Sequence, residues 1–162
     1  MGRNRALISL FLGLLGAAGL TIPTLAASPP TPVTIETVID FRSFPFHGTF
    51  TVPAGASALG CSAGTFVDMP FGNGVGQIHK QITCASGAGA GDGFVVLFKH
   101  DCSFLSQSVF RCVPGPGDVN GHWMILSGSG SFATLRGSGD ISILQVGPLT
   151  GQETLVGNIH FD

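Results

Sequence analysis

The sequence predicts an all-β domain, a single antiparallel barrel of eight strands, with a β-sandwich as the alternative. Apolar and polar residues alternate with period two along several short segments, which is the pattern of half-buried strands. Glycine-rich turns separate these segments at even spacing, and no segment of ten or more residues has helical periodicity. Charged residues make up only 10 % of the chain. They are too sparse to protect open sheet edges, and closure into a barrel removes such edges.

The first 26 residues have the three parts of a secretory signal peptide. Arg3 and Arg5 precede an uncharged apolar run over residues 6–20, and the small-x-small sequence TLA follows at residues 24–26. The apolar run is shorter than the roughly 20 residues that span a membrane. We therefore expect cleavage near Ala26, a secreted, extracellular protein and no membrane span after cleavage; an uncleaved N-terminal anchor is the alternative.

A short linker and one domain follow this leader. Residues 27–32 (ASPPTP) form a stiff, proline-rich linker. Residues 33–162 are predicted to form the barrel domain, because the chain has room for one domain and its 44 % hydrophobic content is enough for a core.

Strands are expected at intervals along the whole domain. The clearest alternation places Phe44, Phe46, Gly48, Phe50 and Val52 on one face. The segment FVVLF at residues 94–98 is apolar on both faces and is predicted to be a central or fully covered strand. Residues 102–112 are expected to form a constrained loop or a short strand. The other expected strands cover residues 33–41, 65–69, 77–84, the segment around Trp123, 138–146 and 153–161.

All four cysteines, Cys61, Cys84, Cys102 and Cys112, lie in the predicted domain. An even number of cysteines in a small exported protein indicates disulfides. Three pairings are open. We favour Cys61 with Cys84 and Cys102 with Cys112, because sequence neighbours in an antiparallel meander are usually neighbours in space. The intervals of 23, 18 and 10 residues lack the close spacing of a zinc site.

The stretch from Gly121 to Gly139, GHWMILSGSGSFATLRGSG, joins an apolar strand with the only tryptophan to two Gly-Ser-Gly corners. Glycine permits sharp turns and close approach of two backbones. We therefore expect a fixed corner of the fold here.

Residues 123–139 resemble a motif of small secreted bacterial proteins of uncharacterised function. More distantly, they look like the glycine-rich stretch near the end of the allene oxide cyclase and dirigent barrels. The shared pattern is a strand, Gly-x-Gly, an aromatic residue, a leucine and a second Gly-x-Gly, which are here Gly128, Gly130, Phe132, Leu135, Gly137 and Gly139. The resemblance implies an allene oxide cyclase, dirigent or calycin-like barrel. It assigns no catalytic residue to this chain.

Four aromatic residues, Phe44, Phe46, Phe50 and Trp123, are candidates to line the barrel lumen and to hold a small apolar ligand. An eight-stranded barrel is just wide enough for its own side chains or for one such ligand. The chain has 13 Phe and no Tyr. We favour packing in the core, because a buried phenylalanine needs no hydrogen-bond partner.

No catalytic, metal or cofactor motif is found in the sequence. The histidines lack H-x-H and H-E-x-x-H spacing and are expected on the surface; they are His47, His79, His100, His122 and His160. No G-x-S-x-G elbow accompanies His100, Asp101 and Ser103, so a hydrolase triad is not predicted. A clustered basic face for nucleic acid is also missing from the sequence.

Three classes of function follow from these observations. The first is a non-catalytic extracellular structural or interaction protein, which we favour over an enzyme. The second is a binding module for a small apolar ligand, and the third is an allene oxide cyclase-like or dirigent-like isomerase or cyclisation-guiding enzyme. A filled lumen would favour the first class, and a cavity of Phe, Ile and Val the second. A lumen that holds Glu36, Asp40, Asp68 or Arg42 with a shifted pKa would favour chemistry. Homo-oligomer formation is left open.

Overall fold

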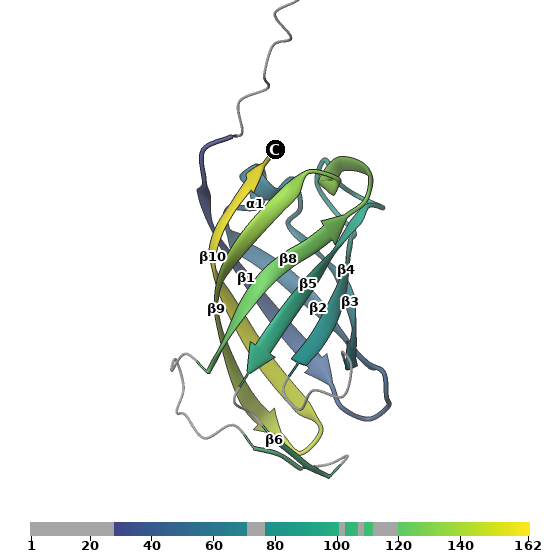
Figure 1. Cartoon of the computed structure of the whole chain (residues 1–162). Helices are drawn as coiled ribbons and strands as arrows, with labels where there is room; N and C mark the ends of the chain where they lie inside the picture. Colours follow the sequence, from purple (N-terminus) through teal and green to yellow (C-terminus); the bar gives the residue numbers. More distant parts are fainter. Residues whose placement is uncertain (1–27, 71–76, 101–102, 107–108, 112–119) are drawn as a thin grey trace, which may run out of the picture.

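A computed structural model of the chain describes residues 28–70, 77–100, 103–106, 109–111 and 120–162 (Figure 1). Eight strands form a closed antiparallel barrel, and a short hairpin forms a separate sheet. The barrel strands are β1 (Thr31–Asp40), β2 (Phe46–Ala54), β3 (Ala63–Pro70), β4 (Gln77–Cys84), β5 (Gly93–His100), β8 (Gly121–Gly128), β9 (Leu135–Gly147) and β10 (Thr150–Phe161). The hairpin consists of β6 (Ser103–Ser106) and β7 (Val109–Arg111).

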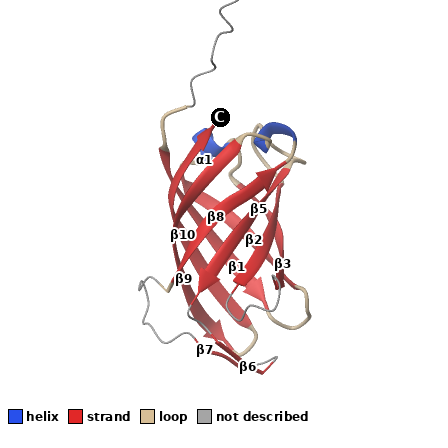
Figure 2. Ribbon diagram, viewed as in Figure 1, coloured by secondary structure: helices blue, strands red, loops and turns tan. Residues whose placement is uncertain are grey.

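The strand order around the barrel is β1-β10-β9-β8-β5-β4-β3-β2, and β2 pairs with β1 again to close it. The prediction of a closed barrel rather than a sandwich is confirmed. We call the lower end the one where β1 ends at Asp40 and β10 begins at Thr150, as drawn in Figure 1. The β6–β7 hairpin lies beyond this lower end (Figure 2), and the C-terminus lies at the upper end.

Alternate side chains of each strand point into the lumen, as the period-two pattern predicts. On β1, Ile35, Thr37 and Ile39 are buried, whereas Glu36 and Val38 are exposed. The same rule holds around the barrel, because successive side chains of a strand point to opposite faces. The largest buried apolar side chains along the lumen include Phe50, Phe66, Phe94, Phe98, Trp123, Ile141, Leu155 and Ile159.

Two short helical segments close the upper end. Helix α1 (Ala56–Leu59) buries Leu59, and the 3-10 turn η1 (Gly130–Phe132) buries Phe132. The Phe132 ring packs edge-on against Phe94, with 5.2 Å between ring centroids. These are the only helical segments among the residues described in the structure, and no helix there is long and apolar enough to cross a membrane.

A disulfide between Cys61 and Cys84 fixes the upper end, with 5.9 Å between the Cα atoms. This pairing was predicted and is confirmed. The second predicted pair, Cys102 with Cys112, lies outside the described residues, as does the predicted signal peptide of residues 1–26.

The corner predicted at residues 121–139 is the connection from β8 through η1 to β9. Trp123, Gly139 and Gly157 lie in one row across β8, β9 and β10. A Cβ atom on Gly139 would come within 2.0 Å of the Val156 carbonyl oxygen and 2.8 Å of the Trp123 Nε1 atom. The row of glycines therefore makes the room in which the indole is buried, and its Nε1–H donates to the Val156 carbonyl at 3.3 Å.

Three details differ from the expectations. Thr31 and Pro32, predicted as linker, already pair with β10 as part of β1. Phe44 precedes β2 instead of belonging to it. The strand at residues 94–98, predicted to be central or fully covered, is paired on both sides, with β4 and β8, but Val95 and Leu97 are only half-buried, since they point outward from the barrel.

Candidate functional site

The lumen of the barrel is occupied by the protein's own side chains along the described strands. At its lower end they leave a hollow of about 10 Å³. A cavity of this size is at the limit for one water molecule. It is lined by Ile39, Phe41, Phe46, Asp68, Ile78, Phe98, His100, Ile143 and Glu153.

Three charged side chains meet in the middle of this apolar interior, and we call them the lumen ion cluster: Asp68, Lys80 and Glu153. The Lys80 Nζ atom lies 2.8 Å from both carboxylate oxygens of Asp68 and 2.9 Å from Glu153 Oε2. The side chain of Lys80 is 0 % exposed, and each carboxylate side chain is 2 % exposed.

Strand register places these groups together. Asp68 on β3 is the direct pairing partner of Lys80 on β4. Glu153 on β10 is the pairing partner of Thr37 on β1, and the Thr37 hydroxyl donates a hydrogen bond to Glu153 Oε2 at 2.9 Å. The strand pairs β3–β4 and β1–β10, which β2 separates in the barrel wall, thus meet through their inward side chains.

An aromatic ring completes the surroundings of the lysine. The Lys80 Nζ atom lies 3.4 Å from the centroid of the Phe66 ring. A cation over an aromatic face is stabilised by the ring quadrupole, and more so when water is excluded.

The ionisation of Asp68 is strongly shifted by this environment. Burial raises the pKa of Asp68 to about 7; the Lys80 ammonium opposes the rise and the Glu153 carboxylate adds to it. Burial outweighs the ion pair because a buried carboxylate loses its hydration.

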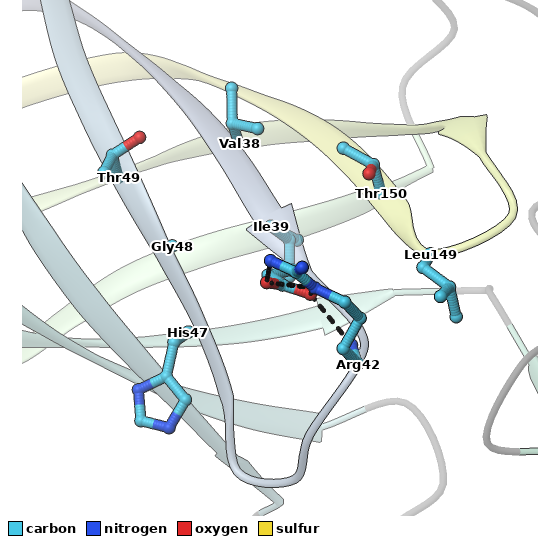
Figure 3. Close-up of a pocket in the computed structure, with 9 residues that line it drawn as sticks. Val38, Ile39, Arg42, His47, Gly48, Thr49, Leu149 and Thr150 are labelled. Atoms are coloured by element: carbon cyan, nitrogen blue, oxygen red, sulfur yellow. Dashed lines mark hydrogen bonds and ion pairs between the residues drawn. The ribbon is translucent and has the colours of Figure 1, made fainter.

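A larger hollow lies on the outside of the barrel, where β1, β2 and the β9–β10 turn meet (Figure 3). Its volume is about 690 Å³. Its lining residues are Val38, Ile39, Asp40, Arg42, His47, Gly48, Thr49, Leu149 and Thr150. A second hollow of about 240 Å³ shares Val38 and Thr49 with it and runs on past Glu36, Thr51, Gln152 and Thr154. We call the two hollows together the outer groove.

The charges in the outer groove neutralise each other at its lower end. The Arg42 guanidinium and the Asp40 carboxylate form an ion pair, drawn as dashed lines in Figure 3. Hydrogen bonds from Arg42 lower the pKa of Asp40 to about 2. Val38 and Leu149 are 45 % and 39 % exposed. The groove thus offers threonine hydroxyls and two aliphatic side chains to a partner.

The four predicted lumen aromatics divide between the inside and the lower rim. Phe50 and Trp123 are buried in the lumen, and Phe46 packs partly buried against the core. Phe44 is 57 % exposed and stacks edge-on against Phe46, with 5.5 Å between ring centroids. The preference for core packing over a ligand pocket fits the first three residues, and Phe44 lies outside.

The positions of Glu36, Asp40, Asp68 and Arg42 were expected to distinguish an enzyme from the other classes of function. Of these four residues, only Asp68 points into the lumen. Glu36, Asp40 and Arg42 lie along the outer groove. Sequence reasoning missed Lys80 and Glu153. A signal was available for Lys80, because it occupies the inward position between Ile78 and Ile82 on an otherwise apolar face.

The histidines are spread over the molecule. His47 lines the outer groove, and His100 is buried beside the lower-lumen hollow. His122 pairs with Asp140 at 2.8 Å, and His160 with Asp162 at 3.3 Å. In the part of the chain that the structure describes, His, Cys, Asp and Glu form no group of three suited to a metal ion.

Fold and site together define a closed eight-stranded antiparallel barrel that buries a lysine between two carboxylates. No protein-family model, curated protein or solved structure matches the chain.

Proposed function

We propose that the protein is a secreted, non-catalytic interaction protein of the cell exterior that acts through its outer surface. The observation that carries this proposal is the packing of the lumen by described side chains such as Phe66, Phe98 and Trp123, beside which the lower-lumen hollow measures about 10 Å³. A small-molecule site usually offers several hundred Å³. The outer groove, with a main hollow of about 690 Å³, reaches that size.

Secretion is supported by two features. The leader has a short basic start, an apolar run and a small-x-small site. The Cys61–Cys84 disulfide fits an oxidising compartment, where such bonds persist.

The outer surface supports contact with a neutral partner. Two apolar side chains that are more than a third exposed, Val38 and Leu149, line the outer groove. Charges are sparse, and the Asp40–Arg42 pair neutralises its own end of the groove. Such a surface suits a partner bound by apolar contact and hydroxyl hydrogen bonds, whereas a strongly charged partner needs a field of opposite sign.

A matched pair of surface variants tests the role of the groove. Val38 and Val156 are both outward valines, 45 % and 52 % exposed, but only Val38 lines the outer groove. We expect Val38→Asp to lower retention of the protein on the insoluble cell-surface fraction of its source at least fivefold, whereas Val156→Asp keeps it. Equal retention of both variants and the wild type would contradict the groove as the binding surface.

A second candidate function is binding of a small apolar molecule in the lower lumen, with or without allene oxide cyclase-like or dirigent-like chemistry. It is favoured by the carboxyl groups of Asp68 and Glu153 at a hollow lined by Phe41, Phe46 and Phe98. Native mass spectrometry of protein recovered from its source separates the candidates. Bare protein is expected for the first function, and a defined co-purifying mass would support the second.

A further inference from the structure

The lumen ion cluster carries one unbalanced negative charge when all three of its groups are ionised. Lys80 supplies one positive charge, and Asp68 and Glu153 supply two negative charges when both are ionised. All three side chains are at most 2 % exposed. An uncompensated buried charge costs several kcal/mol even after relaxation of the protein around it, so a further positive charge is needed at this place.

The neighbouring elements supply little to balance the charge. β1 contributes the neutral Thr37, β2 Phe46, β3 Phe66 and β9 Ile143, none of which carries a charge. β5 contributes Phe98 and His100, and His100 borders the same lower-lumen hollow as both carboxylates. Among the described side chains that line this hollow, His100 is the only titratable group besides Asp68 and Glu153. A proton held by a carboxyl of the cluster, or by His100 beside it, is the compensation that the geometry allows.

We propose that the lumen ion cluster is a proton-binding site, which holds one proton beyond that of Lys80 in acidic and neutral surroundings and releases it in alkaline surroundings, where the lower half of the barrel is then destabilised. This property does not rest on the function proposed for the outer groove. It gives an exported barrel its greatest stability in acidic surroundings.

The direction of the stability change follows from the ionisation of Asp68. Burial raises the pKa of Asp68 to about 7, whereas an aspartate in the unfolded chain titrates near 4. Between these two values the folded state binds one proton more than the unfolded state. The stabilisation of the folded state by this extra proton is therefore fully present below about pH 4, and it is lost as the pH rises through about 7. One proton corresponds to a tenfold increase in the unfolding equilibrium constant per pH unit.

Release of the proton should destabilise the lower end of the barrel before the upper end. The hollow beside the carboxylates lies between the cluster and the rings of Phe41 and Phe46. A newly charged carboxylate gains hydration only by admitting water into this hollow, because the upper end is closed by Leu59, Phe132 and the disulfide. Hydrogen exchange should therefore accelerate at the lower ends of β4 and β5 before it does at the upper end.

The direct test is a carboxyl ¹³C NMR titration of the wild-type protein. We expect one carboxyl group of the Asp68–Glu153 pair to take up its proton with a midpoint above pH 6. If Asp68 and Glu153 both titrate below pH 5, the proposal is wrong. Because this test uses the unaltered chain, it does not depend on the folding of any variant.

Variants provide the second test. Asp68→Asn and Glu153→Gln each remove the surplus negative charge, so the pH dependence of the urea midpoint between pH 5 and 8 should largely disappear. Asp92→Asn is the matched control, because Asp92 is a half-buried aspartate whose pKa is lowered by hydrogen bonds from Ser131. It should keep the wild-type slope. A wild-type slope in both cluster variants would overturn the proposal.

Discussion

Lys80 carries its charge in the middle of an apolar lumen, and the carboxylates of Asp68 and Glu153 are as deeply buried as the ammonium group. Each group of such a cluster is stable there only because the others are present. Replacing a whole buried ion cluster by apolar residues is often neutral, whereas removing a single partner is costly. Removing one charged side chain from the cluster should therefore affect stability more than replacing all three by apolar residues.

At the level of this residue, we predict that Lys80→Met destabilises the fold by about 3–5 kcal/mol at pH 7, because it leaves two carboxylates buried without a cation. Lys99→Met, at an exposed position of β5, is the control and should change stability little. Urea unfolding measures both. Similar stabilities of the two variants would show that Lys80 is not needed to balance the carboxylates.

The second prediction at this scale concerns Gly139. A Cβ atom there would collide with the Val156 carbonyl and the Trp123 indole, so Gly139→Ala should cost about 1–3 kcal/mol through overpacking. On the same strand, a Cβ on Gly147 would find its nearest neighbour, a Thr150 carbon, at 3.9 Å. Gly147→Ala should therefore leave the thermal midpoint nearly unchanged, and equal losses in both variants would contradict the packing argument.

Among the elements, the strand pairs β3–β4 and β1–β10 differ in how far a sequence can predict them. Alternation predicts successive strands at residues 65–69 and 77–84, and the structure pairs them so that Asp68 lies opposite Lys80. Glu153 is different. It reaches Lys80 only because the last strand returns to the first, and period-two alternation says nothing about which strands meet across a lumen.

The Cys61–Cys84 disulfide joins the segment before β3 to the end of β4. With a sequence separation of 23 residues, the loss of loop-closure entropy in the unfolded chain amounts to about 3 kcal/mol. We predict that the variant with both Cys61→Ala and Cys84→Ala loses about this much stability. A thermal midpoint equal to that of the oxidised wild type would contradict this estimate.

The same double variant tests the second predicted disulfide. Cys102 and Cys112 should react with an alkylating reagent only after reduction and unfolding, as measured by the mass of the product. Two alkylated thiols in the unreduced, unfolded variant would show that this pair is not bonded.

For the whole molecule, closure of the barrel was predicted from sparse charge and even strand spacing, and it is confirmed. The filling of the lumen could not be predicted in the same way. Residues such as Phe50, Phe66 and Trp123 come from different strands, and only their packing in three dimensions decides whether they leave a ligand cavity. The outer groove could not be predicted either, because its shape depends on the curvature where β1 and β2 meet the β9–β10 turn.

Because a single closed sheet surrounds one core, we predict cooperative unfolding of the whole barrel. Trp123, the only tryptophan, is 3 % exposed, so its emission should be blue-shifted and weakly quenched by acrylamide in the native state. Its fluorescence and the far-UV circular dichroism should change together in urea, as two-state unfolding requires. Separate transitions would indicate that one side of the barrel unfolds independently.

The pairing of the first barrel strand with the last has a consequence for the timing of folding. β1 pairs with β10 over residues 31–40 and 150–159, so the sheet cannot close until β10 has been synthesised. Such long-range pairing makes closure late and slow compared with local hairpins. A nascent chain with this topology therefore stays open until its last strand is available.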